Sequence, residues 1–187
     1  MPFARGLSDE RFLIMYKRVL DRTLAVYQPD AIWMQCGADS LKGDTIGSFN
    51  LTIKGHSSAV EYTLGKNLPI IYSGGGGYHV DNVARCWAYE TMVISGIEDD
   101  TLTIPEKSKY KAWYESPDLL YTRENVHGIK RDLNTDQDCH HLLSKVFGII
   151  DKIDGSIPFL DQMIVPGKDN ELLIRAEEFC PGVSKSK

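Results

Sequence analysis

Apolar and polar positions in the first half of the chain follow two different periods. Residues 8–26 carry apolar side chains three and four positions apart, which predicts a helix with one apolar face. Residues 31–36 and 68–73 are short apolar runs rich in branched and aromatic side chains, which favours strands, and residues 55–66 between them favour a helix. This order predicts a right-handed βαβ unit with parallel strands, and the continuous run at 31–36 predicts a strand buried on both faces.

The second half of the chain carries weaker patterns. Residues 81–95 predict a helix, residues 105–115 a short helix that begins at Pro105, and residues 136–153 an amphipathic helix. Further on, glycine, proline and charge recur without a period, which is typical of irregular structure. We therefore expect one α/β domain followed by an irregular tail, over residues 1–153 and 154–187.

Composition narrows the class of protein. The 187 residues suffice for one domain with a core, and the net charge of −5 gives no basic surface for phosphates, which disfavours direct nucleic-acid binding. No apolar stretch is long enough to span a membrane, and the first residues lack the apolar core of a signal peptide. The cysteines are widely spaced without a CxxC pair, which fits a reducing compartment: Cys36, Cys86, Cys139 and Cys180. These features predict a soluble intracellular protein.

Four consecutive glycines, Gly74 to Gly77, lie between the second predicted strand and the helix at 81–95 and are followed by Tyr78. Glycine allows backbone angles closed to other residues and lets another group approach the main chain, but it costs chain entropy. Four in a row are therefore an improbable choice for a plain turn. In an open α/β sheet, ligands bind at the carboxyl ends of the strands, which is where this run presents Tyr78.

Asp39 follows the first predicted strand as Tyr78 follows the second. Because parallel strands end at the same edge of a sheet, we expect the carboxylate and the phenol to face a common hollow. A carboxylate is a ligand for a divalent cation such as zinc, which usually takes three protein ligands. The hydroxyl of Tyr78 is suited to stabilise an oxyanion on a metal-bound carbonyl.

The other two ligands are not evident from the sequence. His56 opens a predicted helix, which favours a capping or packing role. Asp44 lies in a polar loop, where an aspartate more often caps a turn than binds a metal. His140 and His141 are neighbours on an amphipathic helix and diverge by about 100°, which favours a solvated pair over a catalytic dyad.

Several segments occur in the order found in a known family, and they read QCGADSL at 35–41, GSFNL at 47–51, IKGH at 53–56, GGGGY at 74–78 and NVARCW at 82–87. From about residue 2 to about residue 118 the chain resembles the zinc-dependent histone deacetylases of the class I type. The resemblance implies a partial arginase/deacetylase-like parallel sheet flanked by helices.

The resemblance also implies roles for individual residues. Asp39 matches one of the three zinc ligands of the family, and Tyr78 matches the tyrosine that polarises the acetyl carbonyl. Gly76 and Gly77 match the wall of the substrate site beside that tyrosine. By the same resemblance, zinc is the cofactor, acetylated histone tails are substrates, corepressor proteins are partners, and the protein acts in the nucleus, with a cytoplasmic pool.

The chain departs from the family pattern because some of the family's catalytic segments lie upstream of the matching region. The other two zinc ligands, an Asp-x-His segment, and the catalytic histidine pair of the family lie upstream of the aligned region. The Asp-x-His at residues 138–140 falls in the late predicted helix and is not assigned that role. We therefore expect the chain to correspond to the carboxyl-terminal half of the catalytic domain and to be inactive alone.

Three interpretations stay open on the sequence. The chain is a partial or half-length deacetylase, a non-catalytic interaction subunit of chromatin complexes, or one half of an enzyme completed by a second chain. A hydrolase of the same fold acting on small acetylated amines is disfavoured because residues 82–87 are so similar to class I. The unpaired edge of a partial parallel sheet predicts self-association, misfolding or a partner chain, unless residues 119–187 fold back over it.

Overall fold

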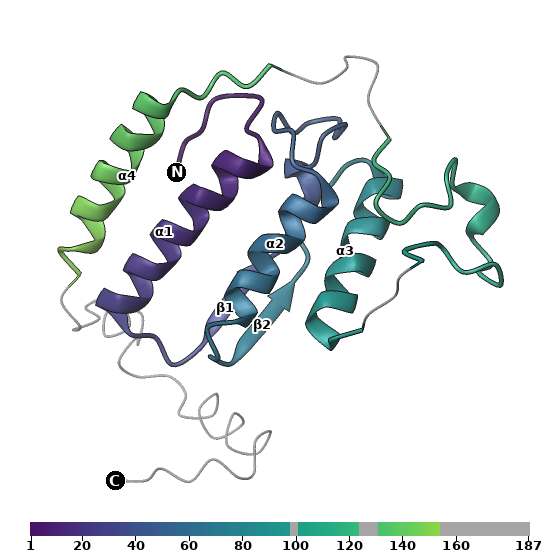
Figure 1. Ribbon diagram of the computed structural model, residues 1–187, viewed down its shortest axis with the longest axis horizontal. Helices are drawn as coiled ribbons and strands as arrows, with labels where there is room; N and C mark the ends of the chain where they lie inside the picture. Colours follow the sequence, from purple (N-terminus) through teal and green to yellow (C-terminus); the bar gives the residue numbers. More distant parts are fainter. Residues whose placement is uncertain (98–100, 124–130, 154–187) are drawn as a thin grey trace, which may run out of the picture. The chain divides into compact units, whose positions relative to one another are not determined.

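The computed structural model describes residues 1–97, 101–123 and 131–153, which belong to one compact unit (Figure 1). Its elements are α1 (Asp9–Tyr27), β1 (Ile32–Gln35), the 3-10 turn η1 (Ala38–Ser40), α2 (Ile53–Leu64), β2 (Ile70–Ser73), α3 (Val80–Ser95), the 3-10 turn η2 (Lys111–Trp113) and α4 (Asp136–Ile150). The predicted tail lies outside the described residues, and the domain boundary stays a prediction.

The two strands form the predicted parallel pair. Ile32 lies opposite Ile70 and Gln35 opposite Ser73, and α2 connects the strands. The chain leaves both strands at the same edge of the sheet, as the βαβ pattern predicts. Among the described residues each strand has only the other as a neighbour.

Helices cover one face of this sheet. The hydroxyl of Tyr16 in α1 lies 2.6 Å from Oγ1 of Thr63 in α2 and 3.9 Å from Sδ of Met34 in β1. On the opposite face, Trp33 is 73% exposed and its register partner Ile71 is 61% exposed. The prediction of a strand buried on both faces is therefore wrong for the described residues, because the described helices pack on one side of the strands only.

The core lies directly beneath the edge at which the strands end. It is formed by residues that are at most 1% exposed: Ala38, Leu41, Leu51, Ile53 and Cys86. These residues come from η1, the following loop, α2 and α3, so the loops after the strands are anchored on a fully buried cluster.

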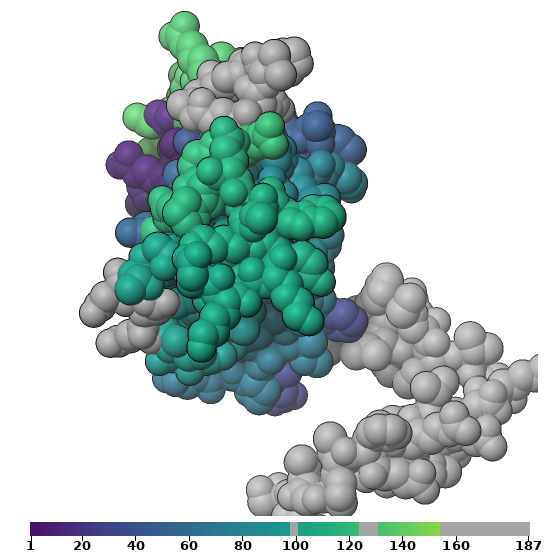
Figure 2. Space-filling view, turned by 90° about the vertical axis from the view of Figure 1, so that its right-hand side faces the viewer, coloured from purple at the N-terminus to yellow at the C-terminus, as the bar shows by residue number. Residues whose placement is uncertain are grey.

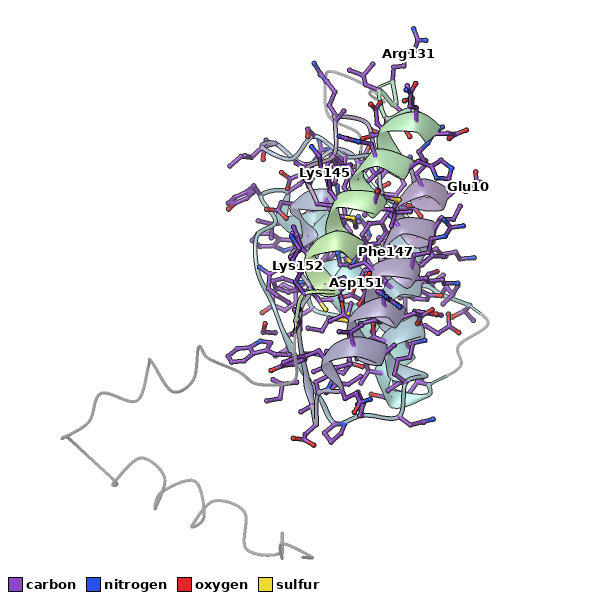
Figure 3. The ribbon with its side chains drawn as sticks, turned by 90° about the vertical axis from the view of Figure 1, so that its left-hand side faces the viewer. Glu10, Arg131, Lys145, Phe147, Asp151 and Lys152 are labelled. Atoms are coloured by element: carbon purple, nitrogen blue, oxygen red, sulfur yellow. The ribbon has the colours of Figure 1, made fainter. Side chains whose placement is uncertain are left out.

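The late amphipathic helix is confirmed as α4, which lies along α1 (Figures 1 and 3). Ion pairs join the two helices at both ends, Arg11 to Asp136 at 2.9 Å and Arg22 to Asp151 at 2.6 Å. Figure 3 looks onto α4 and labels Asp151 at its carboxyl-terminal end.

The predicted helix at 105–115 is wrong except for the short turn η2. Backbone hydrogen bonds of this segment run across it instead, from Ile104 N to Pro117 O and from Leu119 N to Leu102 O, both at 2.8 Å. These bonds hold the two ends of the segment side by side, so that the residues between them form a loop over α3.

Candidate functional site

Asp39 lies on the turn η1, immediately after β1, and contacts the glycine run that follows β2. The backbone N–H of Ala38 donates to the carbonyl of Gly76 at 2.7 Å. The carboxylate of Asp39 lies so close to the α-carbon of Gly76 that a side chain at position 76 would overlap it. The two loops are therefore bound to one another, and a side chain at position 76 would force the carboxylate of Asp39 to move.

Gly77 is constrained by its backbone conformation and by a neighbouring side chain. Its φ of +138° is a conformation that residues with side chains rarely adopt, and a side chain there would meet Val83 of α3. The space that Gly76 and Gly77 leave open is thus occupied in part by the protein's own side chains. Whether these glycines also line a substrate site stays a prediction.

Hydrogen bonds hold the main chain of Tyr78 in place, whereas its side chain is exposed to solvent. Its backbone N–H donates to Oδ2 of Asp44 at 2.7 Å, and its carbonyl accepts from Oγ1 of Thr45 at 2.9 Å. The residue is 52% exposed and stands two positions before the first residue of α3. Asp39 and Tyr78 therefore lie on contacting loops at one edge of the sheet, as expected, while their catalytic roles stay predictions.

Asp44 organises the loop between them. It is 2% exposed, and its Oδ1 accepts from the backbone N–H groups of Ile46 at 2.8 Å and Gly47 at 2.7 Å. The same carboxylate holds Tyr78 through Oδ2. The turn-capping interpretation of Asp44 is confirmed, and the long-range bond to Tyr78 gives this cap a second role in positioning the glycine run.

A buried polar cluster beneath η1 was not evident from the sequence. Nδ1 of His56 in α2 lies 2.5 Å from Oε1 of Glu90 in α3, and its Nε2 donates to the carbonyl of Gly37 at 3.0 Å. Sγ of Cys86 lies 3.7 Å from the same Nδ1. His56 thereby connects α3 to the turn that carries Asp39. The sequence signal that could have indicated this pair is a histidine and a glutamate on helix faces that are otherwise apolar.

The electrostatics of this cluster favour a charged histidine. Burial alone lowers the pKa of His56, but the hydrogen bond and the charge of Glu90 outweigh it, so the pKa of His56 is raised above its ordinary value. Burial raises the pKa of Cys36 to about 12 and also raises the pKa of Cys86. Both thiols are therefore protonated at neutral pH and are not activated nucleophiles.

The potential zinc ligands among the described residues do not form a complete zinc site. His56, Cys86 and Glu90 are the one group of three potential ligands among the described residues. However, two ligands held at about 2.0–2.1 Å by one tetrahedral zinc ion lie roughly 3.3 Å apart, whereas Nδ1 and Oε1 lie 2.5 Å apart. This pair is a hydrogen bond, not a metal site. Asp39 fits as a single ligand, and the described residues do not bring it two more.

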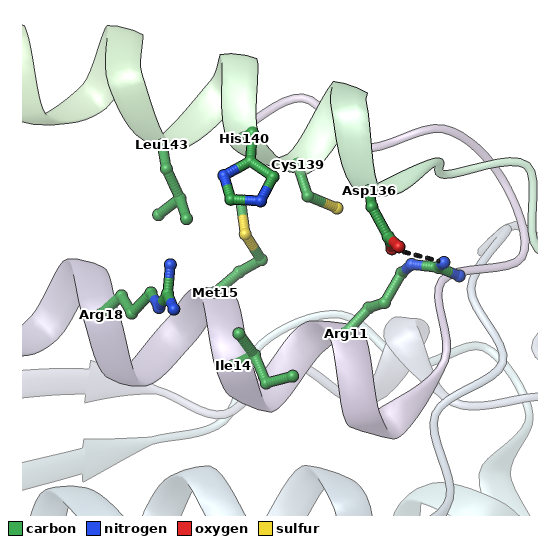
Figure 4. A pocket seen from close by; sticks show the side chains of 8 residues that line it. All are labelled: Arg11, Ile14, Met15, Arg18, Asp136, Cys139, His140 and Leu143. Atoms are coloured by element: carbon green, nitrogen blue, oxygen red, sulfur yellow. Dashed lines mark hydrogen bonds and ion pairs between the residues drawn. The ribbon is translucent and has the colours of Figure 1, made fainter.

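The Asp-x-His segment of α4 does not form a metal site either. Asp138 completes the capping box of its own helix by accepting from the backbone N–H of Thr135 at 3.1 Å. His140 lies over Met15 at a hollow of about 180 Å³ between α1 and α4, shown in Figure 4. This hollow contains none of the predicted site residues, so it is a gap between helices rather than a catalytic cleft.

Comparison with known proteins agrees with this geometry. The sequence profile of the histone deacetylase domain matches residues 1–94. Histone deacetylase 6 of Arabidopsis thaliana is 39% identical over 154 residues, which are 80% of this chain and 32% of that protein. Histone deacetylase 1 of Homo sapiens is 45% identical over 114 residues, which are 61% of this chain and 23% of that protein.

The chain belongs to the histone deacetylase family, is of its class I type, and has part of the arginase/deacetylase fold. This family is zinc-dependent. The chain spans about a third or less of the length of these relatives.

Proposed function

We propose that this chain supplies two groups of a histone deacetylase site: Asp39 as one zinc ligand and Tyr78 as the hydroxyl that stabilises the oxyanion. Gly76 and Gly77 would form the wall beside the acetyl-lysine side chain of the substrate. The observation that carries this proposal is the contact between the loops after β1 and β2, which sets the carboxylate of Asp39 against Gly76.

The proposal assigns the remaining ligands and the general base to groups outside the described residues. Without them nothing takes the proton of the attacking water, so we expect the purified chain to release no acetate from an acetyl-lysine histone peptide with added zinc. Zinc-dependent release that is lost in Tyr78→Phe would show instead that the chain holds a complete site. An assembly purified from cells through this chain should release acetate, and lose that activity in Tyr78→Phe and Asp39→Asn.

The exposed sheet face favours a second candidate, a non-catalytic interaction subunit of chromatin complexes. Trp33 and Ile71 place large apolar side chains beside one another on this face, as interaction surfaces do. This candidate predicts that Tyr78→Phe and Asp39→Asn change neither the activity nor the composition of the purified assembly.

The proposed reaction implies a cellular location, substrates and partners. We propose action in the nucleus, with a cytoplasmic pool, on acetylated histone tails and together with corepressor proteins. The net charge of −5 disfavours direct contact with nucleic acid. In the described part of the chain, no helix has the length and apolar character needed to cross a membrane.

A further inference from the structure

A second hollow lies away from the edge that carries Asp39 and Tyr78. It has a volume of about 280 Å³ and lies between α3 and the segment 101–123. Figure 2 faces this side of the molecule, where the segment covers α3. Apolar side chains supply most of its lining, among them Ala88, Met92, Ile104 and Leu119. The crossing hydrogen bonds from Ile104 to Pro117 and from Leu119 to Leu102 fix the outer wall.

Among the described residues, Arg85 of α3 is the one charged residue that lines this hollow. It is 2% exposed, and its guanidinium lies 4.7 Å from the ring centre of Tyr114 and 5.1 Å from that of Tyr121. It donates to the carbonyl of Ser116 at 2.5 Å. Within the described ranges no carboxylate pairs with it, and its Nε has no hydrogen-bond partner.

This arrangement is incomplete as a purely structural contact. A buried cation without a counter-ion is costly, and an unpaired buried N–H adds to that cost. Two aromatic faces offset part of it through cation–π attraction, but neither accepts the hydrogen of Nε. A bound anion beside the guanidinium would supply the missing charge, whereas Nε itself has no surface open to a ligand.

We propose that the hollow binds a small monocarboxylic acid with a compact apolar body. The carboxylate pairs with Arg85, and the hydrocarbon part lies against Ala88 and Met92. A single cation among apolar neighbours suits one carboxylate better than a phosphate, whose second charge would have no partner. The volume is just below the roughly 300–1,000 Å³ of pockets for drug-sized ligands, so the acid is smaller than these. Tyr110, 65% exposed, stands at the mouth.

The test uses the full chain, cyclohexanecarboxylate as the probe and cyclohexanecarboxamide as its neutral counterpart, with binding followed by NMR titration. We expect the acid to bind about tenfold or more tightly than the amide, because the amide loses the charge-assisted hydrogen bond. Arg85→Gln should remove this preference. Ala88→Phe fills the hollow from an exposed helix position while Arg85 is kept, and should abolish binding of both probes. Ala25→Phe, on an exposed position of α1, is the matched control.

Three results would overturn the proposal. They are equal binding of acid and amide, no binding of the acid in the millimolar range, and unchanged binding of the acid in Ala88→Phe. If Arg85→Gln fails to fold, the comparison of Ala88→Phe with Ala25→Phe still decides where the acid binds. None of these measurements depends on deacetylase activity. Failure of this site would therefore not count against the proposed function, and failure of the proposed function would not count against this site.

Discussion

The carboxylate of Asp39 rests on the α-carbon of Gly76, and this contact joins the loop after the first strand to the loop after the second. It places the carboxylate that we propose as a zinc ligand beside the main chain of the glycine run. A side chain added at position 76 must displace the carboxylate of Asp39, and η1 is also held by the hydrogen bond from the N–H of Ala38 to the carbonyl of Gly76.

The first prediction concerns Gly76→Ala. The added methyl group overlaps the carboxylate of Asp39, so we expect the free energy of unfolding to fall by about 1–3 kcal/mol. Gly148→Ala is the control, because a side chain there has nothing within 4 Å in the middle of α4. It should raise stability by about 0.5–1 kcal/mol. Urea unfolding measures both, and a Gly76→Ala protein as stable as the wild type would contradict the contact.

A second prediction concerns the carboxylate of Asp44, which accepts three backbone N–H groups. Asp44→Ala leaves these donors without their partner, so we expect a loss of at least about 2 kcal/mol in unfolding free energy. Asp44→Asn keeps one acceptor oxygen and should lose less, while amide exchange at Tyr78 accelerates. Asp81→Asn, in the first turn of α3, is the control and should cost at most about 1 kcal/mol. Unchanged exchange at Tyr78 in Asp44→Asn would refute the role of Asp44 in holding the glycine run.

Features that depend on the local sequence pattern could be predicted from the sequence. Asp39 and Tyr78 were placed at one edge because parallel strands must end together. The bond from Tyr78 to Asp44 was not predictable, since it joins residues 34 positions apart whose meeting depends on the packed loop. The pairing of His56 with Glu90 likewise depends on how α2 packs on α3, which no period encodes. The exposure of Trp33 depends on what covers the strand, and an apolar run does not specify that.

The third prediction is a dependence of stability on pH that comes from His56. Its pKa is raised in the folded protein above the ordinary value of 6.5. The ion pair with Glu90 therefore contributes fully below that ordinary value, and its contribution is lost as the pH rises through the raised folded pKa. Unfolding free energy should fall over this range, and His56→Gln should flatten the profile. His141→Gln, on the exposed surface of α4, should leave the profile unchanged. An unaltered profile in His56→Gln would refute a charged His56.

The fourth prediction separates a buried contact just before α4 from an exposed contact at its carboxyl-terminal end. Asn134 is 4% exposed; its Oδ1 accepts from the backbone N–H of Ala4 at 2.7 Å and its Nδ2 donates to the carbonyl of Ala4 at 3.1 Å. Asn134→Ala leaves both groups of Ala4 unpaired and should cost about 1–3 kcal/mol. Arg22→Ala breaks the exposed pair with Asp151 and should cost less than about 1 kcal/mol. Equal losses in thermal unfolding would contradict this anchoring role of Asn134.

The last prediction concerns the exposed sheet face. Trp33 and Ile71 are paired in register and are 73% and 61% exposed. Parallel sheets are normally covered on both faces, and apolar surface of this kind favours contact with another chain. We therefore expect the purified chain to self-associate, with an average mass by light scattering that rises with concentration.

A double substitution tests which surface is responsible. Trp33→Lys with Ile71→Lys places charges on the open face and on both strands, and charged side chains of this kind oppose strand and sheet association. Trp113→Lys removes an equally exposed tryptophan, at 79%, from η2 and is the matched control. The double variant should remain a monomer at concentrations where the wild type and Trp113→Lys associate. If the wild type is a monomer that unfolds cooperatively at every concentration, the open face is stable in water on its own. In that case a partner is not needed to cover it.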